Sequence, residues 1–287
     1  MISLSLTTWS DHPLFTNHPK DFNSKATLTQ YASYLPAVEV DMPFYRIPPV
    51  STVENWQRQV PAQFQFILKA NRLMTKHDYY HPATPDERNM AFKRFQKCVE
   101  PLIKKHQLKT VLFQFPPYFQ RNSKNANYLK EIRKRLPKLP ITVEFRNPSW
   151  YRDRKIETWV AELLARLGMT EAIVDEPNNV NNGVPFLPVI TNHHLIVLRL
   201  HGRNSYGWFH QGKNWRRTRT LYHYSPQELK DLAKLVKQLS KDAHEVCVIF
   251  NNNSAKDAAP NAMQLKHLLH LHFKHLAPRQ PRQMNLF

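Results

Sequence analysis

Polar side chains that can act as acids, bases or ligands recur near the ends of short apolar segments in this sequence. In the segment 142–146, valine and phenylalanine alternate with threonine, Glu144 and Arg146. Neighbouring residues of a β-strand point to opposite faces, so Glu144 and Arg146 would share one face and the apolar residues the other. Similar patterns place polar side chains on that face, or at strand ends, at Thr7, Glu39, Lys69, Gln114, Asp175, Arg199, His201 and Asn251.

These residue types suit acid–base chemistry on an anion. Glu39 and Glu144 are candidates for shared acid–base catalysis, and His201 is a candidate for proton transfer near neutral pH. Lysine and arginine side chains would hold a phosphate or another anion as a cationic clamp. The candidate ligand-binding residues are Tyr45, Lys69, Gln114, Arg146, Asp175, Arg199, Arg203 and Asn251, and the clamp would consist of Lys69, Arg146, Arg199 and Arg203. The first hypothesis is therefore a hydrolase or isomerase for a phosphorylated or otherwise anionic small molecule, with no cofactor.

A structural interpretation competes with this one. Buried charges are costly unless they are paired, so the same side chains could satisfy one another as an ion network. The residues that would form this network are Glu39, Lys69, Glu144, Arg146 and Arg199. Because polar residues fall at the ends of all the candidate strands at once, we favour a ligand site over a purely structural network.

A metal-dependent interpretation uses the acidic residues and the histidine. Glu39, Glu144, Asp175 and His201 offer oxygen and nitrogen ligands of the kind found in metal-dependent phosphodiesterases and isomerases with barrel folds. The nearby lysine and arginine side chains would compete for these carboxylates. We therefore assign no metal ligand, and a metal assay would separate the two hypotheses.

A third hypothesis rests on charge. The chain has 41 Lys and Arg residues against 22 Asp and Glu, a formal net charge of +19, which attracts polyanions. The segment 206–224 interleaves aromatic residues with basic ones, a pattern that suits base stacking and phosphate contact. Its aromatic residues include Trp208 and Trp215, and its basic residues are Lys213, Arg216, Arg217 and Arg219. We favour the alternative in which this segment folds over the active-site mouth as a lid and nucleic acid is not its ligand.

The elements that would position these side chains alternate along the chain. Strand-like segments recur about every 35 residues, with helical patterns between them, as in a βα repeat. They are 2–7, 37–41, 64–70, 110–115, 141–146, 171–175, 195–201 and 245–251. Alternating strands and helices form a parallel sheet, and eight such strands favour a closed (β/α)8 TIM barrel over an open doubly wound sheet. We expect a single barrel domain over 1–277, followed by a mobile tail over 278–287.

Three segments carry the signature of a helix capping box, in which a serine or threonine is followed three residues later by glutamate. Thr84 precedes Glu87 and Ser225 precedes Glu228, each with proline at the first helical position. Ser51 precedes Glu54 without the proline. These signatures place helix starts after the second, third and seventh strands.

Other features exclude several classes of protein. The glycine-rich phosphate loops of nucleotide-binding proteins are absent. Cys98 and Cys247 are far apart and lie in apolar patterns, so we expect packing residues in a reducing compartment. The start of the sequence lacks a signal peptide and no segment resembles a membrane span, so a cytoplasmic location is expected. The last helix is expected to carry four solvent-facing histidines, His267, His270, His272 and His275.

Several of these segments also carry a family resemblance. The chain resembles the YecE-like family, a domain of unknown function (DUF72) with a TIM-barrel fold, in six motifs that occur in the family's order along nearly the whole chain. The resemblance implies the barrel and no established activity. Departures are the opening Leu6-Thr7-Thr8-Trp9-Ser10, Asp41 in place of asparagine and Asn71 in place of a frequent proline. The motifs are 38–46, 66–70, 112–117, 143–150, 199–204 and 250–253.

Overall fold

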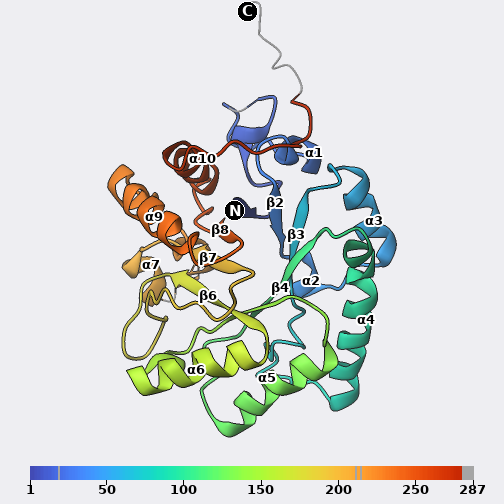
Figure 1. The fold of residues 1–287 in the computed structure, drawn as a ribbon, viewed down its shortest axis with the longest axis vertical. Coiled ribbons are helices and arrows are strands. Elements are labelled where there is room, and N and C mark those ends of the chain that lie inside the picture. Colours follow the sequence, from blue (N-terminus) through green and yellow to red (C-terminus); the bar gives the residue numbers. More distant parts are fainter. Residues whose placement is uncertain (19, 211, 214, 280–287) are drawn as a thin grey trace, which may run out of the picture.

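The computed structural model describes residues 1–18, 20–210, 212, 213 and 215–279. Its centre is a closed barrel in which eight parallel strands follow one another in sequence order (Figure 1). The TIM barrel that the spacing predicts is therefore confirmed. The strands are β1 Ile2–Thr7, β2 Ala37–Val40, β3 Gln65–Lys69, β4 Leu108–Gln114, β5 Ile141–Glu144, β6 Met169–Asp175, β7 Ile196–Leu200 and β8 Val246–Phe250.

Helices surround the barrel, with one break in the alternation. Residues 176–195, which join β6 to β7, are all described and contain no helix. This segment includes Pro177, Pro185 and Pro188, which disfavour a helix interior. The helices are η1 Pro13–Phe15, α1 Leu28–Ala32, α2 Met42–Tyr45, α3 Val50–Arg58, α4 Pro85–Lys104, α5 Ser123–Arg135, η2 Pro148–Tyr151, α6 Arg154–Arg166, α7 Ser205–Phe209, α8 Trp215–Thr218, α9 Pro226–Leu239 and α10 Ala258–Leu268.

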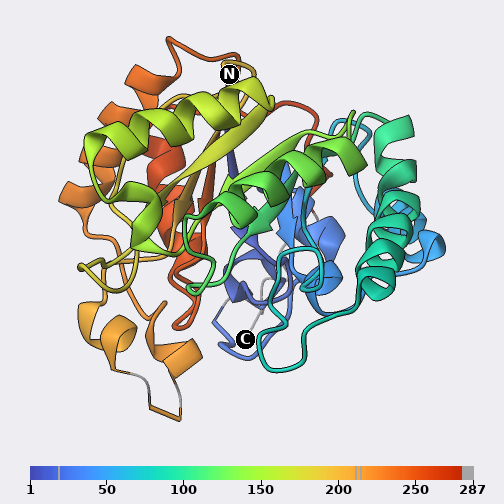
Figure 2. The same cartoon turned by 90° about the horizontal axis from the view of Figure 1, so that it is seen from below.

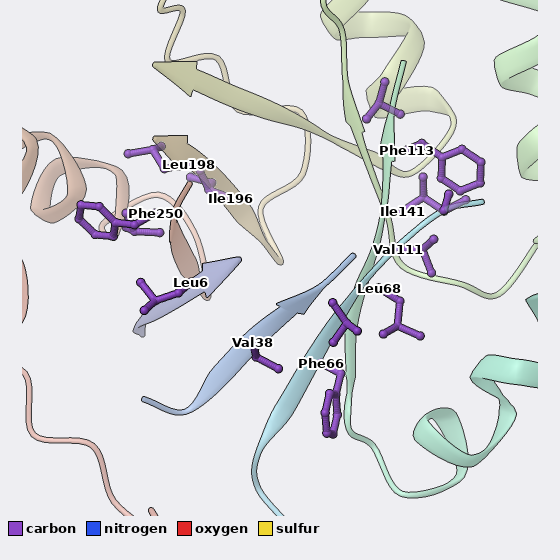
Figure 3. Close-up of a cluster of buried hydrophobic side chains, with 14 of the residues drawn as sticks. Leu6, Val38, Phe66, Leu68, Val111, Phe113, Ile141, Ile196, Leu198 and Phe250 are labelled. Carbon is purple, nitrogen blue, oxygen red and sulfur yellow. The ribbon is translucent and has the colours of Figure 1, made fainter. Parts of the chain in front are cut away.

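Alternate residues of each strand point to opposite sides of the sheet, so the strands lie between two apolar layers. The larger core lies between strands and helices, and Figure 3 shows Phe66, Phe113 and Phe250 among its strand residues, pointing outward from the barrel. A smaller core fills the barrel interior and includes Ile67, Leu112, Leu195, Val197, Cys247 and Ile249. Residues two positions further along these strands also face inward, at the C-terminal end of the barrel.

Two of the three predicted capping boxes form. The hydroxyl of Thr84 accepts a hydrogen bond from Glu87 N, and that of Ser225 accepts one from Glu228 N. The box predicted at Ser51 is wrong. Helix α3 begins one residue earlier, at Val50, so Ser51 already lies inside the helix and cannot cap it. Pro49 takes the N-cap position in an extended conformation. A fourth box, which the sequence analysis missed, begins at Thr27.

The C-terminal region differs from the expected long helix. Helix α10 ends at Leu268, so only His267 of the four histidines lies in it. All four histidines are exposed, as expected. Arg279 lies over the ring of Tyr34 at 4.4 Å, and residues 280–287 of the predicted tail are outside the described residues.

Two remaining predictions concern the cysteines and the membrane. Cys98 and Cys247 are both buried and unpaired, and burial raises the pKa of each thiol to about 12, as packing residues would require. None of the helices in the described residues combines the length and apolar character that a membrane span requires.

Candidate functional site

Figure 2 shows the two ends of the barrel. The N-terminus lies at one end of the barrel, and the segment that carries α7 and α8 lies at the other, the end to which the strands point. We call this end the mouth. The inward positions of the last strand residues open into it, so the mouth is the face at which TIM-barrel proteins carry their active sites.

Arg199 is the centre of the charged cluster beneath the mouth. Its Nε donates to Glu39 Oε2 at 2.9 Å and its Nη2 donates to Glu39 Oε1 at 2.6 Å. Its Nη1 donates to Glu144 Oε2. All three side chains are almost completely buried. This pairing matches the structural interpretation of these residues, and it leaves Glu39 and Arg199 in the interior rather than at the surface of the mouth.

Arg146 forms a second layer above this cluster. Its Nη1 donates to Glu144 Oε1 at 2.9 Å, and its Nη2 lies 3.2 Å from Glu176 Oε2. His201 Nε2 lies 3.2 Å from the same oxygen of Glu144. Arg146 and His201 therefore converge on Glu144, as their strand positions predict.

Two amides complete this layer. Gln114 Nε2 donates to Glu144 Oε1 at 2.6 Å, and Asn251 Nδ2 lies 2.7 Å from His201 Nδ1. Both amides are partly exposed. They therefore form the boundary between the buried charges and the opening of the mouth.

Lys69 reaches the mouth from β3. Its Nζ lies 3.6 Å from Asp41 Oδ1 and 4.8 Å from the ring centroid of Phe44. Asp41 follows β2 and was noted in the sequence only as a departure from the family pattern. Its pairing with Lys69 places it on the inward side of the barrel.

Strand β6 corrects one prediction. Asp175 does not face the mouth. Its carboxylate accepts two 3.0 Å hydrogen bonds from Arg203 Nε and one of 2.8 Å from the Tyr224 hydroxyl, between the strand and the surrounding loops. The inward residue is Glu176, one position later, because Ala172 and Val174 face inward and Ile173 packs in the outer core. Sequence reasoning missed Glu176 because β6 is buried on both faces and its apolar residues 172–174 show no alternation.

The predicted four-residue clamp therefore does not form as one unit. Arg203 is 40% exposed and pairs with Asp175 and Glu228 outside the mouth. Tyr45 also lies elsewhere. It is 68% exposed and lines a surface groove of about 950 Å³ beside α4. Neither residue contacts the charged cluster around Arg199, because each follows the end of its strand by several residues and turns away from the axis.

The two carboxyls that contact Arg146 differ in protonation. Burial favours the neutral form of Glu144, but Arg199, His201 and Arg146 together hold its pKa well below the usual value. Burial raises the pKa of Glu176 to about 8, because Arg146 offsets only part of the desolvation. At neutral pH Glu144 is ionised and Glu176 is protonated. Burial also raises the pKa of Glu39, despite its pairing with Arg199.

Two histidines near the mouth stay neutral. Burial lowers the pKa of His201 to about 3, with Arg146 and Arg199 adding to the effect. Burial and the charges of Lys69 and Arg146 likewise lower the pKa of His77 to about 3. His201 is therefore not poised for the proton transfer near neutral pH that the sequence predicts. Burial is the largest cause in both cases, and the carboxylate of Glu144 raises the pKa of His201 against it.

The segment after β7 covers the mouth. Trp208 is only 2% exposed, and its ring lies 4.8 Å from the Arg146 guanidinium. Trp215 Nε1 donates to Trp208 O at 3.2 Å, and Arg219 lies over the Trp215 ring at 4.8 Å. Lys213 and Arg217 are exposed, whereas the side chain of Arg216 is outside the described residues. The two tryptophans are thus used for packing, as the lid interpretation expects, whereas Tyr206 is 73% exposed.

One group of side chains has the composition of a metal site. Ligand atoms of Glu144, Glu176 and His201 lie within 4.8 Å of one another, and all three residues are buried. The guanidinium of Arg146 already contacts two of them and lies 3.4 Å from His201 Nε2. A divalent ion would have to displace this cation. The three residues therefore do not fit a metal as they are arranged.

The fold and this polar mouth define a TIM-barrel protein of an uncharacterised class. Residues 3–285 match the family described as "Protein of unknown function DUF72", and the chain belongs to this family, as the resemblance to YecE-like proteins indicates. The chain is 38% identical over 283 residues to the UPF0759 protein YunF of Bacillus subtilis, an alignment that covers 98% of this chain and 99% of the relative.

Solved structures support the same membership. A crystal structure of a DUF72 family protein from Enterococcus faecalis is 39% identical, with a TM-score of 0.89, and the match covers 98% of this chain and 99% of that one. A DUF72 family protein from Thermotoga maritima is 29% identical, with a TM-score of 0.76, over 94% of this chain and 100% of that one. The names of these proteins state no ligand or reaction.

Proposed function

We propose that this chain is an enzyme for a phosphorylated or otherwise anionic small molecule, which it binds in the mouth and processes with Glu176 as general acid. The observation that carries the proposal is the state of Glu176. Its Oε1 accepts a hydrogen bond from Val184 N at 3.1 Å, so the proton of the neutral carboxyl belongs on Oε2. That oxygen is buried and makes no hydrogen bond in the described part of the chain, although Arg146 Nη2 lies 3.2 Å away.

The neighbouring carboxylate supports acid–base chemistry. Enzymes that use two carboxyls in different roles hold their pKa values apart, so that one donates a proton while the other stays ionised. Glu176 and Glu144 meet this condition on either side of one guanidinium. The pair suits hydrolysis or isomerisation, in which one group protonates a leaving or carbonyl oxygen.

Local charge supports an anionic ligand. Because Glu176 is neutral, the ionised carboxylate beside Arg146 is that of Glu144, which also pairs with Arg199. The charges of Lys69 and Arg146 add to burial in lowering the pKa of His77, so two cations act on this part of the mouth. An anion beside Arg146 would take the place of the missing carboxylate charge. Trp208 must move aside for such a ligand to enter, which makes the segment after β7 a lid.

The proposal is tested with inorganic phosphate and sulfate. At about 100 times Kd, a ligand that binds only the folded state stabilises it by about 2.7 kcal/mol. We expect this increase for the wild type, and a much smaller one for Arg146→Lys, because an ammonium cannot hold an anion through two parallel hydrogen bonds. Thermal unfolding with and without the anion measures both.

Arg166→Ala is the matched control, since Arg166 is an exposed arginine on the outer helix α6. It should respond to phosphate as the wild type does. An anion-induced shift that survives in Arg146→Lys, or its absence from the wild type, would contradict the proposal.

A further inference from the structure

The mouth contains polar oxygens that lack a hydrogen-bond partner among the described residues. The hydroxyl of Thr7 ends β1, is buried, and has no hydrogen-bond partner among the described residues. It lies beside Glu39 in the strand register, on the inward face. Asp41 Oδ1 is likewise buried and lacks a hydrogen-bond partner within the described chain, although Lys69 lies 3.6 Å away.

The two amides at the edge of the mouth add to this set. Gln114 uses its Nε2 on Glu144 and Asn251 uses its Nδ2 on His201, so each leaves its carbonyl oxygen without a partner in the described residues. Four oxygens at the C-terminal ends of β1, β2, β4 and β8 can therefore accept from a ligand, of which Thr7 Oγ1 and Asp41 Oδ1 are buried and those of Gln114 and Asn251 belong to partly exposed side chains. Each of them can accept a hydrogen bond, and the Thr7 hydroxyl can also donate one.

Buried polar atoms without partners are rare in native proteins and call for an explanation at each site. A fully ionised phosphate ester or a carboxylate offers only acceptor oxygens at its charged group, so that group pairs with Arg146 and Lys69 but cannot bond to the oxygen of Asp41 or to an amide carbonyl. A ligand that satisfies both sets must carry an anionic group and several hydroxyl groups, which donate.

We infer that the ligand is a phosphorylated sugar or polyol, whose phosphate faces Arg146 and whose hydroxyls donate to Asp41, Thr7, Gln114 and Asn251. This inference rests on the proposed function, because it assumes the anion site beside Arg146. The inference goes further because it names the chemical class of the ligand to which the anionic group is attached. The division of the mouth into a cationic side and an acceptor side would orient such a molecule.

The inference is tested by comparing phosphate esters that differ only in their hydroxyls. Methyl phosphate carries the same charged group as ribose 5-phosphate and glucose 6-phosphate and has no hydroxyl on its carbon. We expect at least one of the two sugar phosphates to bind about tenfold tighter than methyl phosphate, since hydrogen bonds to charged and buried groups carry free energies of this order. Calorimetric titration measures the three affinities.

Two variants locate the effect. Asp41→Ala should abolish the preference for the sugar phosphate, while methyl phosphate binds at least as well because Lys69 loses its carboxylate partner. Thr7→Val, which keeps the side-chain shape, should reduce the preference without changing the affinity for methyl phosphate. Asp231→Ala is the control, because Asp231 is exposed on α9 and outside the mouth.

The outcomes separate the two proposals. Equal affinity for methyl phosphate and both sugar phosphates would overturn the inference and leave the anion site intact. A preference that persists in Asp41→Ala and Thr7→Val would also overturn it. Failure of every phosphate, inorganic phosphate included, to bind would overturn the proposed function and the inference with it.

Discussion

The protonation state of Glu176 sets the charge beside Arg146. In the unfolded chain a glutamate has a pKa near 4.5, whereas burial raises that of Glu176 to about 8 in the folded protein. Between these values the folded state holds one more proton than the unfolded state. The contribution of Glu176 to stability is therefore complete below pH 4.5 and falls as the pH rises through about 8, by at most about 1.4 kcal/mol per pH unit.

Glu176→Gln should remove this dependence, because the amide keeps the shape of the neutral carboxyl and cannot ionise. We expect the free energy of unfolding of the variant to change less between pH 5 and pH 8 than that of the wild type, as measured by urea denaturation. Sulfate, whose charge is constant in this range, should bind the wild type more weakly above pH 8 and the variant equally at both pH values. Parallel stability profiles of the two proteins would refute the shifted pKa. Glu162→Gln, at an exposed site on α6, is the control.

For single residues, the sequence predicts which side chains face the barrel interior better than it predicts which side chains pair with one another. Alternation placed Glu144, Arg146, Arg199 and His201 on the inward face, because their neighbours are plainly apolar. It failed on β6, where both faces are buried and the pattern carries no parity. Pairings such as that of Arg199 with Glu39 join residues 160 apart in sequence and depend on side-chain rotamers, which no local pattern encodes.

At the scale of the element, local chemistry fixes where helices begin. The hydroxyls of Thr84 and Ser225 each accept a bond from the backbone N–H of a glutamate three residues later, and that glutamate bonds back. Losing an N-cap hydroxyl typically costs about 1 kcal/mol. Ser51 has the same sequence signature but makes no cap, because the helix starts two residues earlier than a cap at Ser51 requires and Pro49 takes the N-cap position.

These three positions form a matched set. Thr84→Ala and Ser225→Ala should each lower the free energy of unfolding by about 1 kcal/mol, whereas Ser51→Ala should change it by less than about 0.5 kcal/mol. Chemical denaturation of the three variants measures the differences. An equal loss in Ser51→Ala would mean that the signature itself, and not the observed cap geometry, determines stability.

At the scale of the whole molecule, the barrel follows from spacing alone. Strand-like segments about 35 residues apart leave room for one crossover helix each, and eight such units close a parallel sheet. The site could not be predicted as fully, because closing the barrel brings together residues from strands far apart in sequence. The lid illustrates this: its basic and aromatic composition suggests nucleic acid, yet the fold buries Trp208 against Arg146.

The net charge of +19 is also a property of the whole molecule. Exposed lysines and arginines occur on the lid, as at Lys213 and Arg217, and on the outer helix α5, as at Lys130 and Lys134. A charge spread in this way attracts any polyanion at low salt, with an affinity that depends on the number of cations and little on their location. A dedicated nucleic-acid surface would instead depend on the lid.

Single-stranded DNA binding, followed by fluorescence anisotropy over a range of salt concentrations, separates these two cases. We expect Lys213→Ala/Arg217→Ala and Lys130→Ala/Lys134→Ala to reduce the affinity to a similar extent, because each pair removes two charges from the same overall field. Neither should change the salt dependence by more than about two units, the limit for two phosphate contacts. A loss in the lid variant that exceeds the loss in the α5 variant by more than about tenfold would instead identify the lid as a nucleic-acid site. Trp208 is buried against Arg146 and Trp215 donates to Trp208 O, so we expect neither tryptophan to stack on a base.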